Sequence, residues 1–265
     1  MRFETFKPPE MLKSIVWCFW LLEGDASPTH PFTNRPPASS LVNLIFHYQG
    51  GFHMVSPNGE TQHPFITGIH AQTDKFSDIS IQQNFGIFGV FLYPYSVRML
   101  FGIDASEITN QLPDLFSLLG TEAKQLEDEV MLCRDVHERI DVVADFLSRR
   151  LTCSRSHNII PAIQHIYEAK GIVNVDELAT QTFYSLRQFE RIFKEYCGFS
   201  AKKFSRIVRF NSVISDYKRK RVTLSRAAYD LGYYDQSHFI EEFREFSGIN
   251  PRKFFSSQAF EIFRP

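Results

Sequence analysis

Charged side chains in the second half of the chain are spaced to share one face of a helix. Four of them recur at i, i+3, i+4 and i+7, namely Arg187, Glu190, Arg191 and Lys194. The opposite face carries Leu186, Phe189 and Phe193 and is predicted to be core. Basic groups on such a face can reach the base edges and phosphates of duplex DNA. Glu190 can instead pair with Arg187 or Lys194 on a solvated helix.

The same pattern occurs a second time further along the chain. When residues 185–204 are aligned with residues 235–254, six of 20 positions are identical, among them the pairs Phe189/Phe239, Phe193/Phe243 and Gly198/Gly248. Such a repeat indicates one supersecondary unit used twice. The second outward face carries Gln236, Ser237, His238, Ile240, Glu241 and Arg244. It is less basic, so we expect it to contribute less affinity, and His238 can simply cap or orient its helix.

Capping patterns divide each copy into helix, turn and helix. In the first copy, Asn174 begins one helix, and a turn at 182–184 leads to Ser185-x-x-Gln188, a capping box that begins the helix ending at Gly198. The corresponding positions of the second copy are Thr223, residues 232–234, Asp235 and Gly248. One long helix from Ser200 to about Lys220 is predicted to join the copies. Two helices joined by a tight turn are the unit of many DNA-binding domains, whose second helix lies in the major groove.

The net charge of −1 conceals an asymmetry between the two halves of the chain. Residues 1–157 hold 12 Lys and Arg against 18 Asp and Glu, whereas residues 158–265 hold 17 against 12. Residues 187–226 alone have 12 basic and three acidic side chains. A basic half favours nucleic-acid binding. The cluster of Lys218, Arg219, Lys220 and Arg221 is either a phosphate contact or a solvated helix end.

Histidines and cysteines are the residues that would supply metal ligands or nucleophiles. Four histidines lie six, ten and seven residues apart, without the His-x-His pair of a cupin metal site: His47, His53, His63 and His70. Imidazoles at these spacings need not converge. The cysteines, Cys18, Cys133, Cys153 and Cys197, are isolated and form no CxxC pair. No phosphate-binding loop or triad spacing occurs. We therefore expect no metal, cofactor, catalytic residue or disulfide.

Short β-branched and aromatic runs fill the first half of the chain as far as about residue 95. Strands are predicted at 41–47, 52–56, 65–69 and 85–93, with a turn at 56–59. From 96 to 157 the apolar spacing becomes helical. We predict an α+β chain of two domains, in which residues 1–157 form a β-barrel or sandwich followed by helices and residues 158–265 form an all-α domain. The mouth of such a barrel can bind a small molecule.

Membrane insertion is not indicated by any segment. The apolar run 15–22 has only eight residues, and the uncharged stretch 79–97 is interrupted by Gly, Pro, Asn and Gln and is predicted to form buried strands. The N-terminus lacks the apolar core of a signal peptide. We therefore expect a cytoplasmic protein that associates with the nucleoid and has no membrane partner.

The second half resembles the DNA-binding domain of the AraC/XylS family of transcription regulators over about 100 residues, from Ile159 to Phe255. The first copy matches in Leu178-Ala179, Ser185-x-Arg187-x-x-Glu190-Arg191-x-Phe193-Lys194 and Gly198-x-Ser200, and the long helix matches in Phe204-x-Arg206-x-x-Arg209. The most specific stretch runs from Ala228 to Phe239 and continues through Phe243-Arg244 to Gly248-Ile249-x-Pro251.

This resemblance implies seven helices in which the long helix joins two helix-turn-helix units, whose recognition helices enter adjacent major-groove segments. It implies DNA contacts from Ser185, Arg187, Gln188, Glu190, Arg191, Lys194, Arg206, Arg209, Gln236, Ser237, His238, Glu241 and Arg244. Two positions depart from the family pattern. Glu241 stands where the family often has Arg, so its role in base readout stays open, and Ala201 stands where the family usually has Pro.

The first half is similar, in residues 37–47 and its later helices, to cupin-like domains of the same family that sense a small molecule or mediate dimerisation. The leading hypothesis is a sequence-specific DNA-binding transcription regulator, not an enzyme, that a small-molecule effector controls through the first domain. Duplex DNA, RNA polymerase and a second copy of the chain are its expected partners. The alternative is a cupin-like metalloenzyme fused to a DNA-binding domain. A repair regulator that accepts alkyl groups on cysteine is a third hypothesis, for which Cys18 stands alone near the N-terminus.

Overall fold

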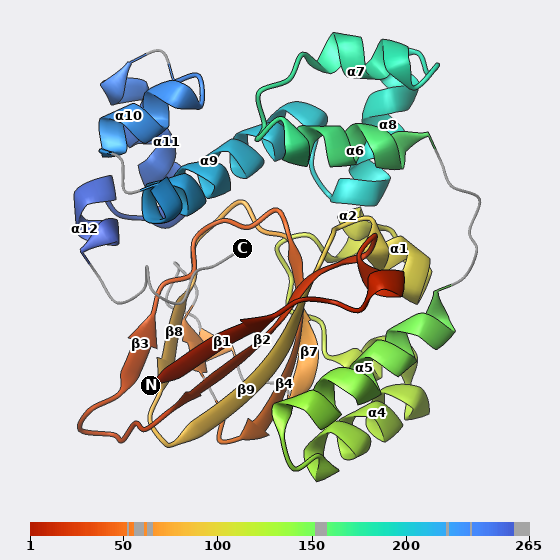
Figure 1. Cartoon of the computed structure of the whole chain (residues 1–265), viewed down its shortest axis with the longest axis vertical. Coiled ribbons are helices and arrows are strands. Elements are labelled where there is room, and N and C mark those ends of the chain that lie inside the picture. Colours follow the sequence, from red (N-terminus) through yellow and green to blue (C-terminus); the bar gives the residue numbers. More distant parts are fainter. Residues whose placement is uncertain are drawn as a thin grey trace.

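Figure 1 shows the computed structural model of the chain, in which a sheet domain with flanking helices lies beneath a layer of later helices. The structure describes residues 1–51, 53–55, 61–62, 66–151, 158–220, 223–233 and 235–256. Among these residues, no helix combines the length and the apolar character needed to cross a bilayer.

The first part of the chain forms two antiparallel sheets. The larger sheet has the order β1 (Arg2–Phe6), β2 (Val16–Gly24), β9 (Phe85–Leu92), β4 (Val42–Gln49), β7 (Thr67–His70). The smaller has the order β3 (Phe32–Asn34), β8 (Asp78–Ile81), β5 (His53–Val55), β6 (Thr61–Gln62). The predicted strands 41–47, 52–56, 65–69 and 85–93 overlap β4, β5, β7 and β9, while the predicted turn at 56–59 lies outside the described residues.

The five-stranded sheet is apolar on both faces, because consecutive side chains of a strand point to opposite sides. On β2, Phe19 and Leu21 belong to the main core, whereas Trp20 and Leu22 belong to a second cluster on the other face. This double burial removes the polar alternation that marks a half-exposed strand. The sequence prediction therefore noted 15–22 only as an apolar run and missed β2, together with its partner β1.

Gly89 in β9 makes room for the largest side chain of the second cluster. It lies opposite Trp20 of β2, and a Cβ at Gly89 would be 2.2 Å from Cε2 of the indole ring. The indole therefore covers the glycine directly. Its Nε1–H donates to Asn43 Oδ1 on β4 over 2.9 Å, which fixes the ring across three strands.

Five helices, with the short 3₁₀ turn Glu10–Leu12, follow or flank the sheets in the described part of residues 1–151. They are α1 (Ser96–Phe101), α2 (Ala105–Ile108), α3 (Leu115–Leu119), α4 (Thr121–Leu132) and α5 (Val136–Arg150). Leu126 and Val130 of α4 and Val143 and Leu147 of α5 are buried in the main core. In Figure 1 these two helices lie beside the five-stranded sheet. They therefore close the sheet face that the second cluster does not occupy.

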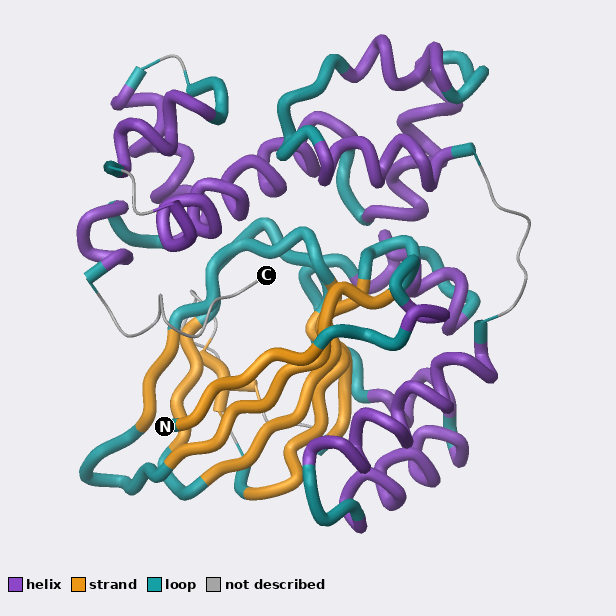
Figure 2. Tube along the Cα trace, viewed as in Figure 1, coloured by secondary structure: helices purple, strands orange, loops and turns teal. Residues whose placement is uncertain are grey.

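Seven helices make up the described part of the chain from residue 158 onward. They are α6 (Ile159–Glu168), α7 (Val175–Gln181), α8 (Leu186–Cys197), α9 (Ala201–Lys220), α10 (Leu224–Asp230), α11 (Gln236–Ser247) and α12 (Pro251–Phe255). Figure 2 shows the long α9 running between the group formed by α6–α8 and the group formed by α10–α12. The predicted pair of helix-turn-helix units with a long connecting helix is therefore confirmed.

Aromatic rings join the sheet domain to both helical groups. Tyr93, just after β9, contacts Tyr167 of α6 with ring centroids 5.3 Å apart, and Tyr167 contacts Phe204 of α9 at 5.6 Å. Further along α9, Phe210 contacts Phe243 of α11 at 5.0 Å. The buried residues of both halves accordingly form one core. The domain boundary predicted at residue 157 falls in 152–157, outside the described residues, and stays a prediction.

Candidate functional site

Helix α8 begins and ends as its capping residues predict. Ser185 Oγ accepts a hydrogen bond from the Gln188 N–H, and Gln188 Oε1 accepts one from the Ser185 N–H, at 3.3 and 3.1 Å. At the other end, Gly198 has φ +79°, a conformation that favours glycine, and its N–H donates to the Lys194 carbonyl. The side chains of Ser185 and Gln188 are exposed, although the capping box already uses them.

Basic side chains extend to solvent from the outward face of α8. Arg187, Arg191 and Lys194 are exposed there, and Arg191 pairs with Glu195 over 2.5 Å while its side chain stays 65% exposed. Glu190 behaves differently. It is half-buried, and its carboxylate accepts a hydrogen bond from the Ala201 N–H at the start of α9, at 3.3 Å. Proline, which the family usually has at position 201, would lack this N–H, so the contact with Glu190 depends on Ala201.

Helix α11 presents a polar face of mixed charge. Asp235 Oδ1 accepts a hydrogen bond from the His238 N–H at 2.8 Å and caps the helix, and Gly248, with φ +73°, ends it. Five of the six predicted outward residues are exposed, namely Gln236, Ser237, His238, Glu241 and Arg244. The prediction is wrong for Ile240, which is half-buried and packs against the core. The His238 ring lies 5.7 Å from the Tyr233 ring, which favours the prediction that His238 orients its helix.

Arg206 and Arg209 of α9 point toward α11 instead of toward the outward faces. Arg206 Nε donates to Glu242 at 2.7 Å and one of its NH₂ groups donates to Glu245 at 2.6 Å. Arg209 donates to Glu242 at 3.2 Å, and the Tyr233 hydroxyl donates to the same carboxylate at 2.5 Å. The two arginines predicted to contact DNA are thus engaged in holding α11 against α9.

Glu242 is the charged centre of this network, with a side chain only 2% exposed. Burial by itself would raise the pKa of its carboxyl group, but the hydrogen bonds from Tyr233 and Arg206 and the charge of Arg209 outweigh burial and hold the pKa below its usual value. The sequence prediction missed Glu242. The signal was a glutamate on the core face of α11, where the first copy of the repeat has Ile192.

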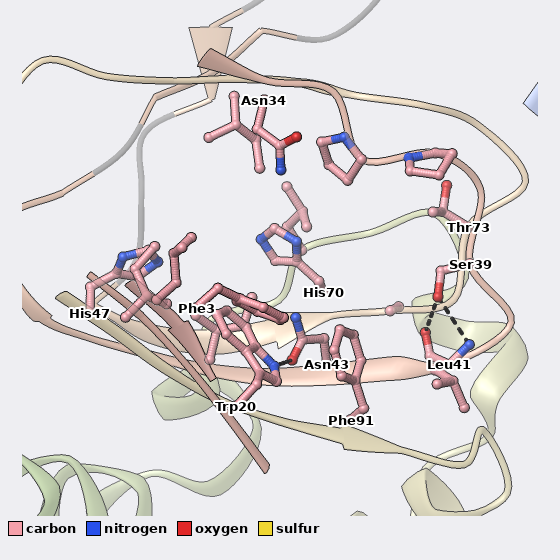
Figure 3. A pocket seen from close by; sticks show the side chains of 18 of the residues that line it. Phe3, Trp20, Asn34, Ser39, Leu41, Asn43, His47, His70, Thr73 and Phe91 are labelled. Atoms are coloured by element: carbon pink, nitrogen blue, oxygen red, sulfur yellow. Dashed lines mark hydrogen bonds between the residues drawn. The ribbon is translucent and has the colours of Figure 1, made fainter. Parts of the chain in front are cut away.

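A cavity of about 160 Å³ lies between the two sheets of the first domain (Figure 3). Most of its lining is aromatic or aliphatic, including Phe3, Trp20, Phe32, Ile45, Ile79, Ile87 and Phe91. The polar groups in the lining come from Asn34, Ser39, Asn43, His47, His70 and Thr73. No Asp, Glu, Lys or Arg occurs among the lining residues that the structure describes.

Two of the four candidate histidines meet in this cavity. His47 on β4 and His70 on β7 both line it, although their sequence spacing gave no reason to expect convergence. Burial, with the nearby His70 as a smaller cause, lowers the pKa of His47 to about 3, and burial lowers the pKa of His70 to about 4. The side chains of His53 and His63 lie outside the described residues. Within the described part of the chain, no three His, Cys, Asp or Glu side chains are grouped as metal ligands.

The cysteine that the repair hypothesis requires is not activated. Burial raises the pKa of the Cys18 thiol to about 12, so the thiol keeps its proton at neutral pH. A nucleophilic cysteine needs the opposite shift, because the thiolate is the reactive form.

The cavity wall formed by residues 36–41 also contacts the helices above it. Pro36, Pro37, Ser39 and Leu41 line the cavity. From the same segment, the Ala38 N–H donates to the Phe246 carbonyl of α11 at 2.8 Å, and Asn211 of α9 donates to the Ala38 carbonyl at 2.9 Å. Asn211 Oδ1 in turn accepts from the Ser40 N–H at 3.3 Å. One short segment thus connects the cavity to both α9 and α11.

Residues 72–76, which we call the clasp, contact the C-terminal ends of α8 and α11. Ser39 and Thr73 exchange two backbone hydrogen bonds of 2.9 Å, so the clasp is joined to residues 36–41 of the cavity wall. A Cβ at Gly198 would lie 2.1 Å from Gln72 Nε2, and a Cβ at Gly248 would lie 2.6 Å from the Phe76 ring. Gly198 and Gly248 are equivalent positions of the repeat. Asp74 of the clasp also forms an ion pair with Lys203 of α9.

Two family profiles match separate parts of the chain. The profile described as "Domain of unknown function (DUF6597)" matches residues 4–114, which contain both sheets except the first two residues of β1. The profile described as "Helix-turn-helix domain" matches residues 178–257, which contain α8, α9 and α11.

Curated relatives share parts of this arrangement. The uncharacterized HTH-type transcriptional regulator YtdP of Bacillus subtilis is 26% identical over 168 residues, which are 57% of this chain and 22% of the relative. The F1 operon positive regulatory protein of Yersinia pestis is 29% identical over 98 residues, which are 37% of this chain and 32% of the relative. The chain thus spans a third or less of the length of each of these two relatives.

Solved structures share the fold over nearly the whole chain. ToxT from Vibrio cholerae O395 superposes with a TM-score of 0.51 at 11% identity, over 89% of this chain and 96% of ToxT. A second ToxT structure, bound to (E)-4-(8-methylnaphthalen-1-yl)but-3-enoic acid, superposes with a TM-score of 0.51 at 10% identity, over 96% of this chain and 98% of ToxT. The chain thus carries a helix-turn-helix domain of the AraC type, preceded by a DUF6597 domain, and is similar to transcription regulators in sequence and to ToxT in fold.

Proposed function

We propose that the protein is a sequence-specific DNA-binding transcription regulator whose affinity for DNA changes when a small molecule occupies the cavity between its sheets. The observation that carries the proposal is the pair of equivalent helices α8 and α11. Each begins at a capped N-terminus, ends at a left-handed glycine and presents an exposed polar face at its own end of α9. Two such helices can enter successive major-groove segments.

Helix α8 supplies most of the DNA affinity in this proposal. Arg187, Arg191 and Lys194 are exposed and basic, so they can reach guanine edges and phosphates, with Ser185 and Gln188 near the helix start. Helix α11 adds polar readout through Gln236, Ser237, His238 and Arg244, and Glu241 can accept a hydrogen bond from cytosine N4. We assign Glu190, Arg206 and Arg209 to positioning the helices, because their side chains are engaged within the domain.

Control by an effector is supported by the two segments that the cavity shares with the DNA-binding helices. Residues 36–41 line the cavity and hydrogen-bond to α9 and α11, and the clasp contacts the ends of α8 and α11. A ligand that shifts either segment therefore changes the placement of the recognition helices. One of the ToxT structures that share this fold is a complex with an aryl-substituted butenoic acid. The class of ligand that this chain binds is inferred from the lining of its own cavity and not from that complex.

Transcriptional activation is the direction that we propose. The Yersinia pestis relative is named a positive regulatory protein. An activator at a promoter recruits RNA polymerase. We therefore propose RNA polymerase as a partner and the nucleoid as the place where the protein acts. A homodimer through residues 1–157 belongs to the same proposal, and sedimentation of the full chain with and without DNA measures it.

The experiment that tests the proposal is genome-wide mapping of the DNA bound by the full chain, followed by fluorescence anisotropy on a mapped fragment and on its scrambled sequence. We expect at least about a thousandfold preference for the mapped fragment, in the range of specific regulators. Footprinting should protect two adjacent major-groove segments. Equal affinity for mapped and scrambled DNA would overturn sequence-specific recognition.

A further inference from the structure

The cavity between the sheets offers a ligand extensive apolar contact and no opposite charge. Its described lining contains neither a carboxylate nor a basic side chain. Charged residues of the adjoining segments are already paired, since Arg35 donates two hydrogen bonds to Asp78 at 2.6 and 2.7 Å and Asp74 pairs with Lys203. A charged ligand would lose its hydration without gaining a counter-ion, which is costly in an apolar site.

The two histidines do not supply the missing charge. Because burial lowers the pKa of His47 to about 3 and that of His70 to about 4, both rings are neutral at physiological pH. They contribute a polar but uncharged edge to the cavity, across from the smaller sheet (Figure 3).

Several polar groups of the lining already have partners within the protein. Asn43 Oδ1 accepts from the Trp20 indole, and Ser39 Oγ accepts from the Leu41 N–H at 3.1 Å. The Thr73 hydroxyl bonds to Asn110 Oδ1 at 2.9 Å. These contacts engage the Asn43 oxygen and the hydroxyls of Ser39 and Thr73 within the wall of the cavity.

Asn34 at the end of β3 is different. Its Oδ1 atom is buried, and no hydrogen-bond partner for it occurs among the described residues. Figure 3 shows its amide group in the cavity, on the side opposite His70. A buried acceptor without a partner costs free energy, and a ligand that donates a hydrogen bond removes this cost.

We infer that the cavity binds an uncharged, mainly apolar molecule that carries a hydrogen-bond donor, a hydroxyl or an N–H, directed at Asn34 Oδ1. This inference rests on the proposed function, because it assigns a ligand class to the cavity through which the regulator is controlled. Aromatic side chains such as Trp20, Phe3 and Phe91 provide flat surfaces for the apolar part.

Three probes of one shape separate charge from hydrogen bonding: naphthalen-1-ylmethanol, 1-methylnaphthalene and 1-naphthoate. Each is titrated into the full chain at neutral pH by isothermal titration calorimetry. We expect the alcohol to bind about tenfold or more tightly than the carboxylate, because the carboxylate is desolvated without compensation. The alcohol should also bind more tightly than the hydrocarbon, and Asn34→Leu should abolish this second difference.

Variants at the wall provide the controls. Ala71→Leu places extra atoms in the cavity and should weaken all three probes, which locates them there. Thr73→Lys adds a cation to the lining and should raise naphthoate affinity relative to Thr73→Met, a neutral side chain of similar length. Circular dichroism and urea denaturation verify that each variant is folded.

The outcomes distinguish this inference from the proposed function. Equal or tighter binding of 1-naphthoate to the unaltered chain overturns the uncharged ligand class while the cavity remains an effector site. An alcohol preference that survives Asn34→Leu overturns the role of Asn34. If none of the three probes binds, the inference and the effector part of the proposed function are both overturned. Sequence-specific DNA binding is tested separately, by comparing the affinities for mapped and scrambled fragments.

Discussion

Arg191 extends into solvent from the exposed face of α8, with Glu195 as its neighbour on the same helix. In Arg191→Ala we expect specific DNA binding to weaken by about 1–3 kcal/mol and the preference at one base to relax, because a guanidinium that pairs with guanine is lost. Anisotropy titrations against single-base variants of a mapped fragment measure both effects.

Arg149→Ala is the matched control for Arg191→Ala. Arg149 lies on α5 of the sheet domain and pairs with Asp145 in the same i,i+4 arrangement, at 3.0 Å. Its removal should leave DNA binding unchanged. If Arg191→Ala lowers affinity equally on every sequence, Arg191 is a phosphate contact and does not read a base.

Glu242 tests whether the ion network of α9 and α11 stabilises the second unit. We expect Glu242→Gln to lower the free energy of unfolding by about 2–3 kcal/mol, less than the roughly 3–5 kcal/mol of a fully buried pair, because Arg206 keeps a third of its side chain exposed. Urea denaturation measures the change. Glu245→Gln is the control, since that half-exposed partner of Arg206 should contribute no more than about 1 kcal/mol.

The same carboxylate gives the stability a definite pH dependence. The pKa of Glu242 is lowered in the folded protein, so the unfolded chain binds its proton first and the stabilisation is complete above the ordinary value of 4.5. It is lost as the pH falls from 4.5 through the lowered folded pKa. The difference between the unaltered chain and Glu242→Gln should therefore shrink in this acidic window. A constant difference would show that Glu242 acts through packing and not through its charge.

At the scale of elements, the sequence predicted whatever is encoded locally. Ser185 and Gln188, Thr223 and Asp235 cap the helices that they were expected to begin, because capping depends on residues two or three positions apart. The two glycine-terminated helices and the long helix between them followed from periodicity.

Features that depend on distant contacts could not be predicted in this way. Glu190 reaches Ala201, 11 residues further on, and Arg206 reaches Glu242, 36 residues further on. Periodicity placed Glu190 on an outward face, and the family resemblance assigned Arg206 to DNA, because neither reveals a partner on another helix. The convergence of His47 and His70 likewise depends on the pairing of β4 with β7. The cavity lining, contributed by several strands and loops, was beyond the reach of a single sequence.

Gly248 joins the end of α11 to the clasp, and replacing it separates two causes of instability. Gly248→Ala should destabilise the chain by about 1–3 kcal/mol from its left-handed φ, with a further loss because the new Cβ meets the Phe76 ring. Thermal or urea unfolding measures the total.

Gly232→Ala is the matched control for Gly248→Ala. Gly232 has φ +77°, but a Cβ there meets nothing within 4 Å, so only the backbone cost applies. The excess loss in Gly248→Ala reports the contact with the clasp. Equal losses in the two variants would show that the clasp yields to the added methyl group at no cost.

At the scale of the whole molecule, an acidic sheet domain is joined to a basic DNA-binding domain. A variant with four Gln substitutions tests how far this charge contributes to DNA binding. It replaces Lys218, Arg219, Lys220 and Arg221, whose side chains lie outside the described ones. We expect the dependence of log affinity on log salt to flatten by about 0.9 for each phosphate contact that is lost. Anisotropy titrations over a range of salt concentrations give the slope. An unchanged slope would assign the cluster to a solvated helix end.

The contact of residues 72–76 with both recognition helices sets a limit on building hybrid regulators. Exchanging the sheet domain with that of a relative at residues 152–157 would also exchange the clasp, which fits the ends of α8 and α11. A hybrid made at this junction gains a new ligand site and loses the surface that places its recognition helices. The productive unit of exchange is therefore the sheet domain without residues 36–41 and 72–76, which should stay with the DNA-binding domain that they contact.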